Sequence, residues 1–144
     1  MANWITENEL DTQKIAFVIA KYQIRRGDVV LLKGEMGAGK TTFVKGAAKA
    51  YWIDDEITSP TYAYMNEYHS PNGTVLYHYD CYRLENGEQA LALGLTDYFY
   101  TEKGICFIEW SENIQSVLPE KVKVITIERL DDEKRKITYE VPRD

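Results

Sequence analysis

The chain has 144 residues, of which 44% are hydrophobic and 28% are charged, and its formal net charge at pH 7 is −6. This composition excludes the disordered and collagen-like classes, and the length suits one domain, which we expect to span residues 1–144. The acidic balance gives no general attraction to nucleic acid or to an anionic membrane.

The charges are unevenly distributed along the chain. Residues 50–102 carry one Lys or Arg against nine Asp or Glu, whereas residues 1–49 carry eight against five and residues 103–144 eight against nine. This acidic middle third favours a protein partner with a basic surface. It argues against direct contact between that region and nucleic-acid phosphates, because such contacts need Lys and Arg.

Two further features are typical of a cytoplasmic protein. Glu7, Glu9 and Asp11 stand where a secretory signal peptide would have an apolar core, and no apolar run approaches the length of a membrane span. Cys81 and Cys106 have neither C-x-x-C spacing nor a His cluster, which predicts two reduced, buried thiols rather than a zinc site. We therefore expect a cytoplasmic protein with no membrane partner.

The first predicted elements are a helix, a strand, a glycine-rich loop and a second helix. Thr6 and Glu9 fit a capping box that begins a helix over about residues 7–23. Residues 28–33 are a β-branched and aliphatic run, which is typical of a strand buried on both faces inside a parallel sheet. Residues 40–51 then predict a helix.

The rest of the chain adds hairpins and a second buried strand. In chain order these segments are an aromatic-rich hairpin (62–69 and 74–80), one or two short helices (84–95), a continuous apolar strand (105–108) and a second hairpin (122–129 and 135–141). Helices that alternate with buried strands, plus hairpins, predict a three-layer α/β domain with a mixed, largely parallel central sheet.

One segment carries a phosphate-binding pattern. Gly34–Thr41 matches G-x-x-x-x-G-K-[ST] in full. In such a loop, backbone N–H groups and the following helix N-terminus surround the phosphates, Lys40 reaches the β and γ phosphates, and the Thr41 hydroxyl ligates Mg²⁺. Thr42 either touches the α-phosphate or simply occupies the first helical turn. The pattern predicts a P-loop NTPase domain that binds a nucleoside triphosphate with Mg²⁺.

A P-loop enzyme also uses a carboxylate at the end of a neighbouring strand, for the magnesium shell or for the attacking water. Two strands end in candidates, Asp80 and Glu109. The apolar run before Glu109 suits a central parallel strand, whereas the polar-aromatic mix before Asp80 suits an exposed hairpin. We assign Glu109 to Mg²⁺ and Asp80 to water positioning or switching. The alternative for each is a carboxylate that closes a strand and meets solvent or a helix cap.

Two more segments are candidates with competing interpretations. Ser59, Pro60, Thr61 and Tyr62 place two hydroxyls around a proline, which suits either a switch-like strip ordered by the γ-phosphate and Mg²⁺ or a plain turn. Trp110 follows the presumed metal ligand and suits a core position or a wall of the site rather than a chemical role.

Taken together, GEMGAGKTT (Gly34–Thr42), SPTY (Ser59–Tyr62), HYDCYRL (His78–Leu84) and EW (Glu109–Trp110) resemble one family in their order and spacing. It is the TsaE family of tRNA threonylcarbamoyladenosine biosynthesis ATPases, and the resemblance spans nearly the whole chain. It implies a cytoplasmic accessory ATPase for threonylcarbamoylation of adenosine 37 in tRNAs that read ANN codons. Such a protein acts with the TsaD–TsaB complex and meets tRNA only through that complex.

The resemblance also implies ATP as the nucleotide and assigns residues by position. Thr41 and Glu109 correspond to magnesium-contacting residues, and Asp80 to an acidic residue needed for activity alongside Lys40. The ATP-binding set that it implies is Gly37, Ala38, Gly39, Lys40, Thr41 and Thr42, with Thr6 and Lys134 near the nucleotide.

Two other functions stay open from the sequence. A small P-loop kinase of a metabolite would need several Arg or Lys around its acceptor site, and Arg83 is the only basic residue of 50–102. An ATP-dependent binding module with incidental hydrolysis would use the same loop. Slow hydrolysis that rises when the partner binds would separate an activated ATPase from such a module.

Overall fold

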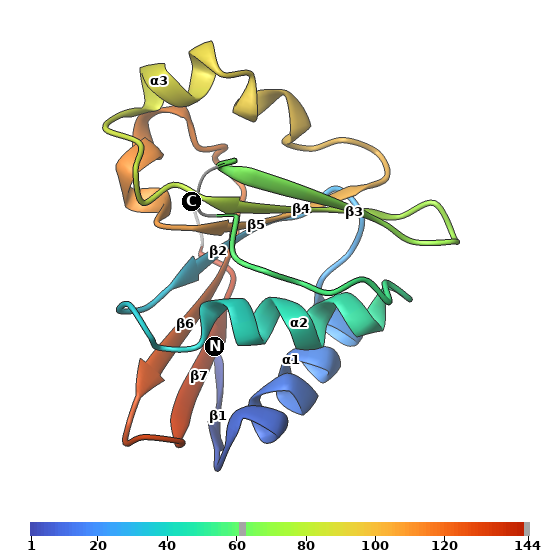
Figure 1. Cartoon of the computed structure of the whole chain (residues 1–144), viewed down its shortest axis with the longest axis vertical. Helices are drawn as coiled ribbons and strands as arrows, with labels where there is room; N and C mark the ends of the chain where they lie inside the picture. Colours follow the sequence, from blue (N-terminus) through green and yellow to red (C-terminus); the bar gives the residue numbers. More distant parts are fainter. Residues whose placement is uncertain (61–62, 143–144) are drawn as a thin grey trace.

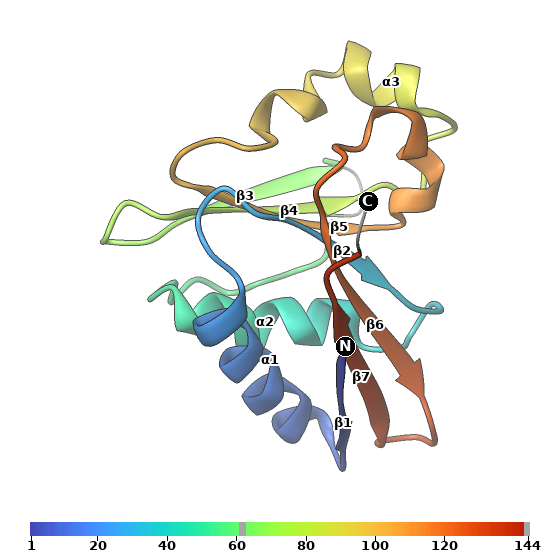
Figure 2. The same cartoon turned by 180° about the vertical axis from the view of Figure 1, so that it is seen from behind.

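A computed structural model describes residues 1–60 and 63–142, and it is organised around a β-sheet with helices on both faces (Figure 1, Figure 2). The strands of the described chain are β1 (Ala2–Thr6), β2 (Val29–Lys33), β3 (Met65–His69), β4 (Val75–Asp80), β5 (Gly104–Glu109), β6 (Lys123–Arg129) and β7 (Arg135–Glu140). The helices are α1 (Glu9–Gln23), α2 (Lys40–Ala50), α3 (Gly87–Ala92) and the 3₁₀ segments η1 (Leu95–Tyr98) and η2 (Ser111–Val117).

The centre of the sheet is parallel. Its strand order is β1-β7-β6-β2-β5-β4-β3. β2 pairs in parallel with β5 and β6, and β5 pairs in parallel with β4, so these four strands end at the same edge of the sheet. The β3–β4 and β6–β7 pairs are antiparallel hairpins, and β1 pairs antiparallel with β7. The predicted mixed, largely parallel sheet with hairpins is confirmed.

The three layers follow from the side-chain pattern of the central strands. Val30 and Leu32 of β2 pack in the core beneath α1 and α2, whereas Val29 and Leu31 pack in the core beneath α3, η1 and η2 (Figure 1). Because successive side chains of a strand point to opposite faces, a strand covered on both sides must be apolar throughout. Burial of each such side chain contributes about 1.5–3 kcal/mol.

The start of the chain differs from the prediction. Thr6 is the last residue of β1, and its fully buried hydroxyl lies 2.7 Å from the hydroxyl of Thr12. α1 begins at Glu9, and the side chain of Asn8 caps it by accepting a hydrogen bond from the N–H of Asp11 at 2.8 Å. The capping box at Thr6 is therefore wrong, because the Thr-x-x-Glu spacing recurs by chance at the end of a strand.

β4 is also different from the prediction, because it is a buried strand rather than the exposed arm of a hairpin. It lies between β3 and β5, and Leu76, Tyr77, His78 and Tyr79 are all buried. The Tyr79 hydroxyl donates to the carbonyl of Leu95 at 2.8 Å. Polar aromatic side chains can be buried when their polar atoms find partners, and this is why the composition of β4 was misleading.

Two sequence expectations concern the thiols and the membrane. Cys81 and Cys106 are free and buried, as predicted. In the part of the chain that the structure describes, no helix combines the length and the apolar character needed to cross a membrane.

Candidate nucleotide-binding site

The glycine loop connects β2 to α2 at the carboxyl edge of the parallel strands (Figure 1). A Cβ on Gly34 would lie 2.5 Å from the carbonyl oxygen of Ile127 in β6, so the loop can pass this point only with glycine. Gly39 is the N-cap of α2 at φ +105°, a backbone region that L-residues rarely adopt. This N-cap has no side chain, and the first N–H groups of α2 are therefore left for an anion.

Lys40 is the cation of the loop and is only 5% exposed. Its Nζ donates to the carbonyl oxygen of Gly34 at 2.7 Å and lies 3.9 Å from the centre of the Trp110 ring. Burial lowers the pKa of Lys40, and nearby carboxylates, of which Glu109 acts most strongly, oppose that shift. The ammonium group is thus held by a carbonyl and an aromatic face at the position from which it could meet a phosphate.

Trp110 forms a wall of this site. Its backbone is left-handed, with φ 59° and ψ 40°, and its ring packs edge-on against the ring of Tyr82 at 5.0 Å between centroids. A non-glycine residue in this conformation is strained, and such strain concentrates at functional sites. The ring lies over Lys40 and is partly buried against the core cluster on the α3 side of the sheet.

Glu109 ends β5 beside the loop, as the sequence predicts for a central parallel strand. It is 5% exposed, and its Oε2 accepts a hydrogen bond from the Thr41 hydroxyl at 3.2 Å. The same oxygen lies 2.5 Å from Nε2 of His78, a fully buried residue of β4. In the sequence His78 is the first residue of the motif HYDCYRL, and no role in the site was predicted for it. The signal that could have found it is its place two residues before Asp80, on the same face of the strand.

Asp80 ends β4 directly opposite Glu109 in the strand register. Its Oδ2 accepts a hydrogen bond from the Ser59 hydroxyl at 3.3 Å, and its Oδ1 accepts one from the N–H of Tyr82 at 3.0 Å. The parallel pairing therefore brings together both predicted carboxylates, although Asp80 arrives on a buried strand.

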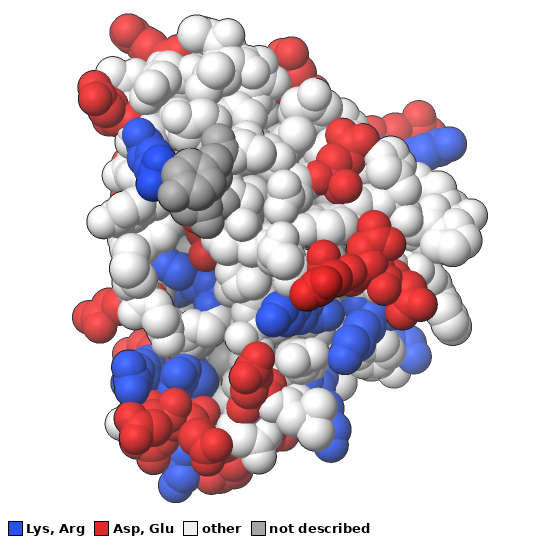
Figure 3. Space-filling model, viewed as in Figure 1, with Lys and Arg blue, Asp and Glu red and all other residues white. Residues whose placement is uncertain are grey.

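These groups surround one pocket of about 520 Å³. It is lined by Met36, Gly37, Gly39, Lys40, Thr41, Thr42, Ser59, Asp80, Tyr82, Arg83, Glu109 and Trp110. Figure 3 shows basic and acidic atoms side by side in a hollow on the side of the molecule where the loop lies. The pocket collects segments that are far apart in sequence around the N-terminus of α2.

A second pocket, of about 280 Å³, adjoins the first on the other side of the loop. Gly37, Gly39 and Thr42 line both. Its most strongly connected residue is Arg135 at the start of β7, whose Nε donates to the carbonyl oxygen of Ala38 at 2.7 Å. Arg135 therefore ties the loop to the β6–β7 hairpin. No motif marks it, because it acts on a backbone carbonyl 97 residues away.

Two residues that the family resemblance places near the nucleotide, Thr6 and Lys134, line neither pocket at the loop. Thr6 has no exposed surface and lines neither pocket, whereas Thr12, its hydrogen-bond partner, lines the second pocket. Lys134 is exposed, lies 3.6 Å from Glu7 and lines neither pocket, although its neighbours in the β6–β7 hairpin do.

The candidate switch strip is only partly described. Ser59 lines the main pocket, and Pro60 is buried with its carbonyl accepting a hydrogen bond from the N–H of Tyr64 at 3.1 Å. Thr61 and Tyr62 lie outside the described residues.

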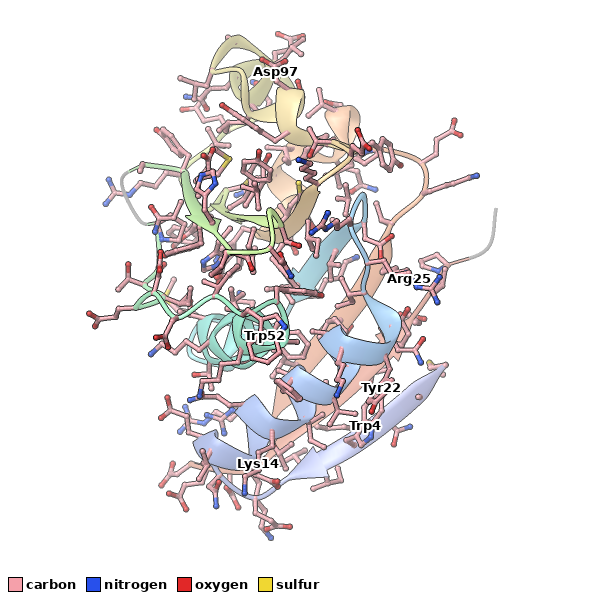
Figure 4. All side chains as sticks on the ribbon, turned by 90° about the vertical axis from the view of Figure 1, so that its right-hand side faces the viewer. Trp4, Lys14, Tyr22, Arg25, Trp52 and Asp97 are labelled. Carbon is pink, nitrogen blue, oxygen red and sulfur yellow. The ribbon has the colours of Figure 1, made fainter. Side chains whose placement is uncertain are left out.

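A third pocket, of about 570 Å³, lies away from the loop between α1, β1 and β7. Figure 4 shows Trp4 and Tyr22, two of its lining residues, close together beside α1. Its lining includes neither the loop nor its carboxylates. The chemistry is therefore concentrated in the smaller pocket at the carboxyl edge.

A strand, a complete phosphate-binding loop and a helix, with carboxylates ending two neighbouring parallel strands, define the fold of a P-loop NTPase. Residues 6–137 match the family model described as "Threonylcarbamoyl adenosine biosynthesis protein TsaE". The chain belongs to the TsaE family.

Individual relatives agree with this assignment. The chain is 40% identical over 137 residues to the tRNA threonylcarbamoyladenosine biosynthesis protein TsaE of Bacillus subtilis, covering 94% of this chain and 83% of that protein. The protein of the same name from Treponema pallidum is 39% identical, with 93% and 96% covered. The crystal structure of Bacillus subtilis YdiB superimposes with a TM-score of 0.78 at 37% identity, covering 96% of this chain and 83% of that one.

Proposed function

We propose that this chain binds ATP with Mg²⁺ and hydrolyses it as an accessory ATPase for threonylcarbamoylation of adenosine 37 in tRNAs that read ANN codons. The observation that carries the proposal is the complete phosphate-binding loop with Glu109 hydrogen-bonded to Thr41 at 3.2 Å. The names of its relatives, tRNA threonylcarbamoyladenosine biosynthesis proteins, supply the process. The proposed place of action is the cytoplasm.

The loop supplies the groups that hold phosphates. Backbone N–H groups of residues 37–42 face the anion, and Lys40 exchanges its carbonyl partner for a phosphate oxygen. The buried position of Lys40 strengthens that contact, because charges interact more strongly where water is excluded. Thr42 lines both pockets and lies where the loop passes from one to the other.

Thr41 and Glu109 fit Mg²⁺ that arrives with the nucleotide. Their oxygens lie 3.2 Å apart at the pocket, close enough to share one cation or one of its waters. Among the described residues, no group of three or more His, Cys, Asp and Glu could hold a metal by itself. Magnesium bound through one or two protein oxygens and substrate phosphates needs no such group. When bound, the ion neutralises charge on the phosphates.

Asp80 is the proposed residue for water positioning or switching. Its carboxylate lines the pocket and is held by Ser59 and by the backbone of Tyr82. Because Ser59 begins the candidate switch strip, this hydrogen bond links the strip to the site. A change in the strip would therefore reach Asp80 directly.

The proposed partner is the TsaD–TsaB complex, with tRNA contacted only through it. The acidic segment 50–102 supports docking to a basic protein surface rather than to RNA. The same segment disfavours a metabolite kinase, because Arg83 is its only basic residue and a phosphoryl acceptor site needs several.

The experiment is ATP hydrolysis by the purified protein alone and with TsaD–TsaB and tRNA, with Lys40→Ala as the background. We expect slow turnover alone and faster turnover with the complex. Unchanged turnover with phosphate appearing on a small-molecule acceptor would favour the kinase, and ATP binding without stimulated turnover would favour the binding module.

A further inference from the structure

His78 is a titratable residue of the site that the proposed mechanism has not used. It lies in the middle of β4, has no exposed surface, and places Nε2 2.5 Å from Oε2 of Glu109. Burying a polar ring on a covered face of the sheet is unfavourable unless the ring makes a contact that compensates for lost water. The contact with Glu109 is that compensation, so the position of His78 is explained by the carboxylate and not by packing alone.

The other ring nitrogen identifies the direction of the hydrogen bond. Within the described part of the chain, Nδ1 of His78 is buried without any hydrogen-bond partner. A proton on Nδ1 would be a buried donor with no acceptor, which costs more than a bare nitrogen. The proton therefore lies on Nε2, and His78 donates to Glu109.

This donation fixes one side of the Glu109 carboxylate. Oε2 accepts hydrogen bonds from both His78 Nε2 and the Thr41 hydroxyl, at 2.5 and 3.2 Å. No donor among the described residues bonds to Oε1, the second oxygen of a carboxylate that lines the pocket. The Thr41 hydroxyl would turn toward Mg²⁺ during binding, and within the described residues His78 is then the remaining donor to the carboxylate.

We propose that His78 is a positioning residue that orients the Glu109 carboxylate toward the metal and nucleotide, a role that rests on the proposed function. It acts through Glu109, and its own ring has no surface at the pocket. It is distinct from Asp80, which lies two residues further along the same strand and faces the pocket directly.

Substitutions of His78 separate the hydrogen bond from the packing. The amide nitrogen of Gln lies where Nε2 lies in His, whereas that of the shorter Asn lies nearer the position of Nδ1. His78→Asn and His78→Leu should lower single-turnover ATP hydrolysis and raise the half-saturating Mg²⁺ concentration by roughly 10- to 100-fold, as for other residues that orient a metal ligand. His78→Gln should recover most of both, and the KM for ATP should change little.

Tyr79→Phe is the matched control, because it removes a buried hydrogen bond from the neighbouring residue of β4 on the opposite face. It should lose stability and keep the wild-type rate and Mg²⁺ dependence. Thermal unfolding of each variant shows which proteins are folded at the assay temperature.

The test is the Mg²⁺ dependence of single-turnover hydrolysis for the wild type, the Gln, Asn and Leu variants and the control. Rescue by Gln but not by Asn supports the proposal, even if the Leu variant does not fold. The same Mg²⁺ dependence in the Gln and Asn variants, or the same shift in Tyr79→Phe, would overturn this role of His78. Neither result would contradict the proposed ATPase function. A wild type that neither binds nor hydrolyses ATP overturns the proposed function and this role together.

Discussion

The two ends of the central parallel strands carry pockets of nearly the same size and of opposite character. The pocket at the carboxyl edge has a volume of about 520 Å³, and the one at the amino edge, lined by Asp28, Tyr100 and Lys123 among others, about 500 Å³. At the amino edge Lys123 is paired with Asp28 at 2.7 Å, and Lys121, which also lines that pocket, is exposed to solvent. At the carboxyl edge Lys40 forms no ion pair with any described residue. An unpaired, buried cation beside carboxylates indicates a site that a ligand completes.

The largest expected effect comes from removing the cation at each end. Lys40→Ala should lower ATP hydrolysis by roughly 100- to 1000-fold, because it removes the charge that meets the phosphates. Lys123→Ala breaks a partly exposed pair and should leave hydrolysis unchanged, with at most about 1 kcal/mol lost from the free energy of unfolding. Steady-state phosphate release measures the hydrolysis rate of both variants, and thermal unfolding measures their stability. Equal losses of activity would mean that the two edges do not differ in function.

A smaller loss should follow from neutralising the carboxylate at each end. Glu109→Gln keeps the shape of the side chain and should reduce hydrolysis at low Mg²⁺ by roughly 10- to 100-fold, with partial recovery at high Mg²⁺. Asp28→Asn is the matched variant at the amino edge and should show the wild-type Mg²⁺ dependence. Full Mg²⁺-dependent activity in Glu109→Gln would move the metal role to Asp80.

A third prediction concerns how tightly the loop is held to the sheet. Gly34→Ala places a Cβ against Ile127 and should lower the free energy of unfolding by about 3 kcal/mol. In Gly37→Ala the new Cβ meets no atom within 4 Å, and the only cost is the left-handed backbone at φ +79°. The free energy of unfolding should therefore fall by about 1 kcal/mol. Denaturant unfolding of both variants checks the order. A reversed order would contradict the packing of the loop base against β6.

The last prediction is a dependence of stability on alkaline pH, which is absent at neutral pH. Burial raises the pKa of the Cys106 thiol from 9.0 to about 12, so the folded state holds this proton more strongly than the unfolded state does. The contribution of this protonated thiol to the free energy of unfolding is fully present below about pH 9 and is lost as the pH rises toward 12. Cys106→Ala should therefore show a shallower loss of unfolding free energy above pH 9. A decline as steep as that of the wild type would argue against this linkage.

Much of the architecture could be predicted because its signals are local. A complete phosphate-binding pattern between a buried strand and a helix gave the position of the loop, and the apolar run before Glu109 gave a central parallel strand. Neighbouring parallel strands end at the same edge of the sheet, so the fold class predicts that the loop and Glu109 lie close together. Asp80 also lies at that edge and lines the pocket, although β4 is a buried strand and not the exposed one that was predicted.

What could not be predicted depends on contacts between distant residues. His78 lies in a polar and aromatic segment that is typical of an exposed strand, and the pairing of β4 with β5 brings its ring to Glu109. Arg135 holds the carbonyl of Ala38 from the far end of the chain. Thr6 matched a local capping pattern, but pairing of β1 with β7 placed it at a strand end and buried it. In each case tertiary packing decided a role that the local pattern left open.

The central claim is that the carboxyl-edge pocket binds ATP with Mg²⁺, and calorimetric titration with ATP tests it most directly. The account predicts saturable binding by the wild type and by Lys123→Ala that depends on Mg²⁺, and loss of tight binding in Lys40→Ala. Equal ATP affinity in the wild type and Lys40→Ala, both folded, would contradict it.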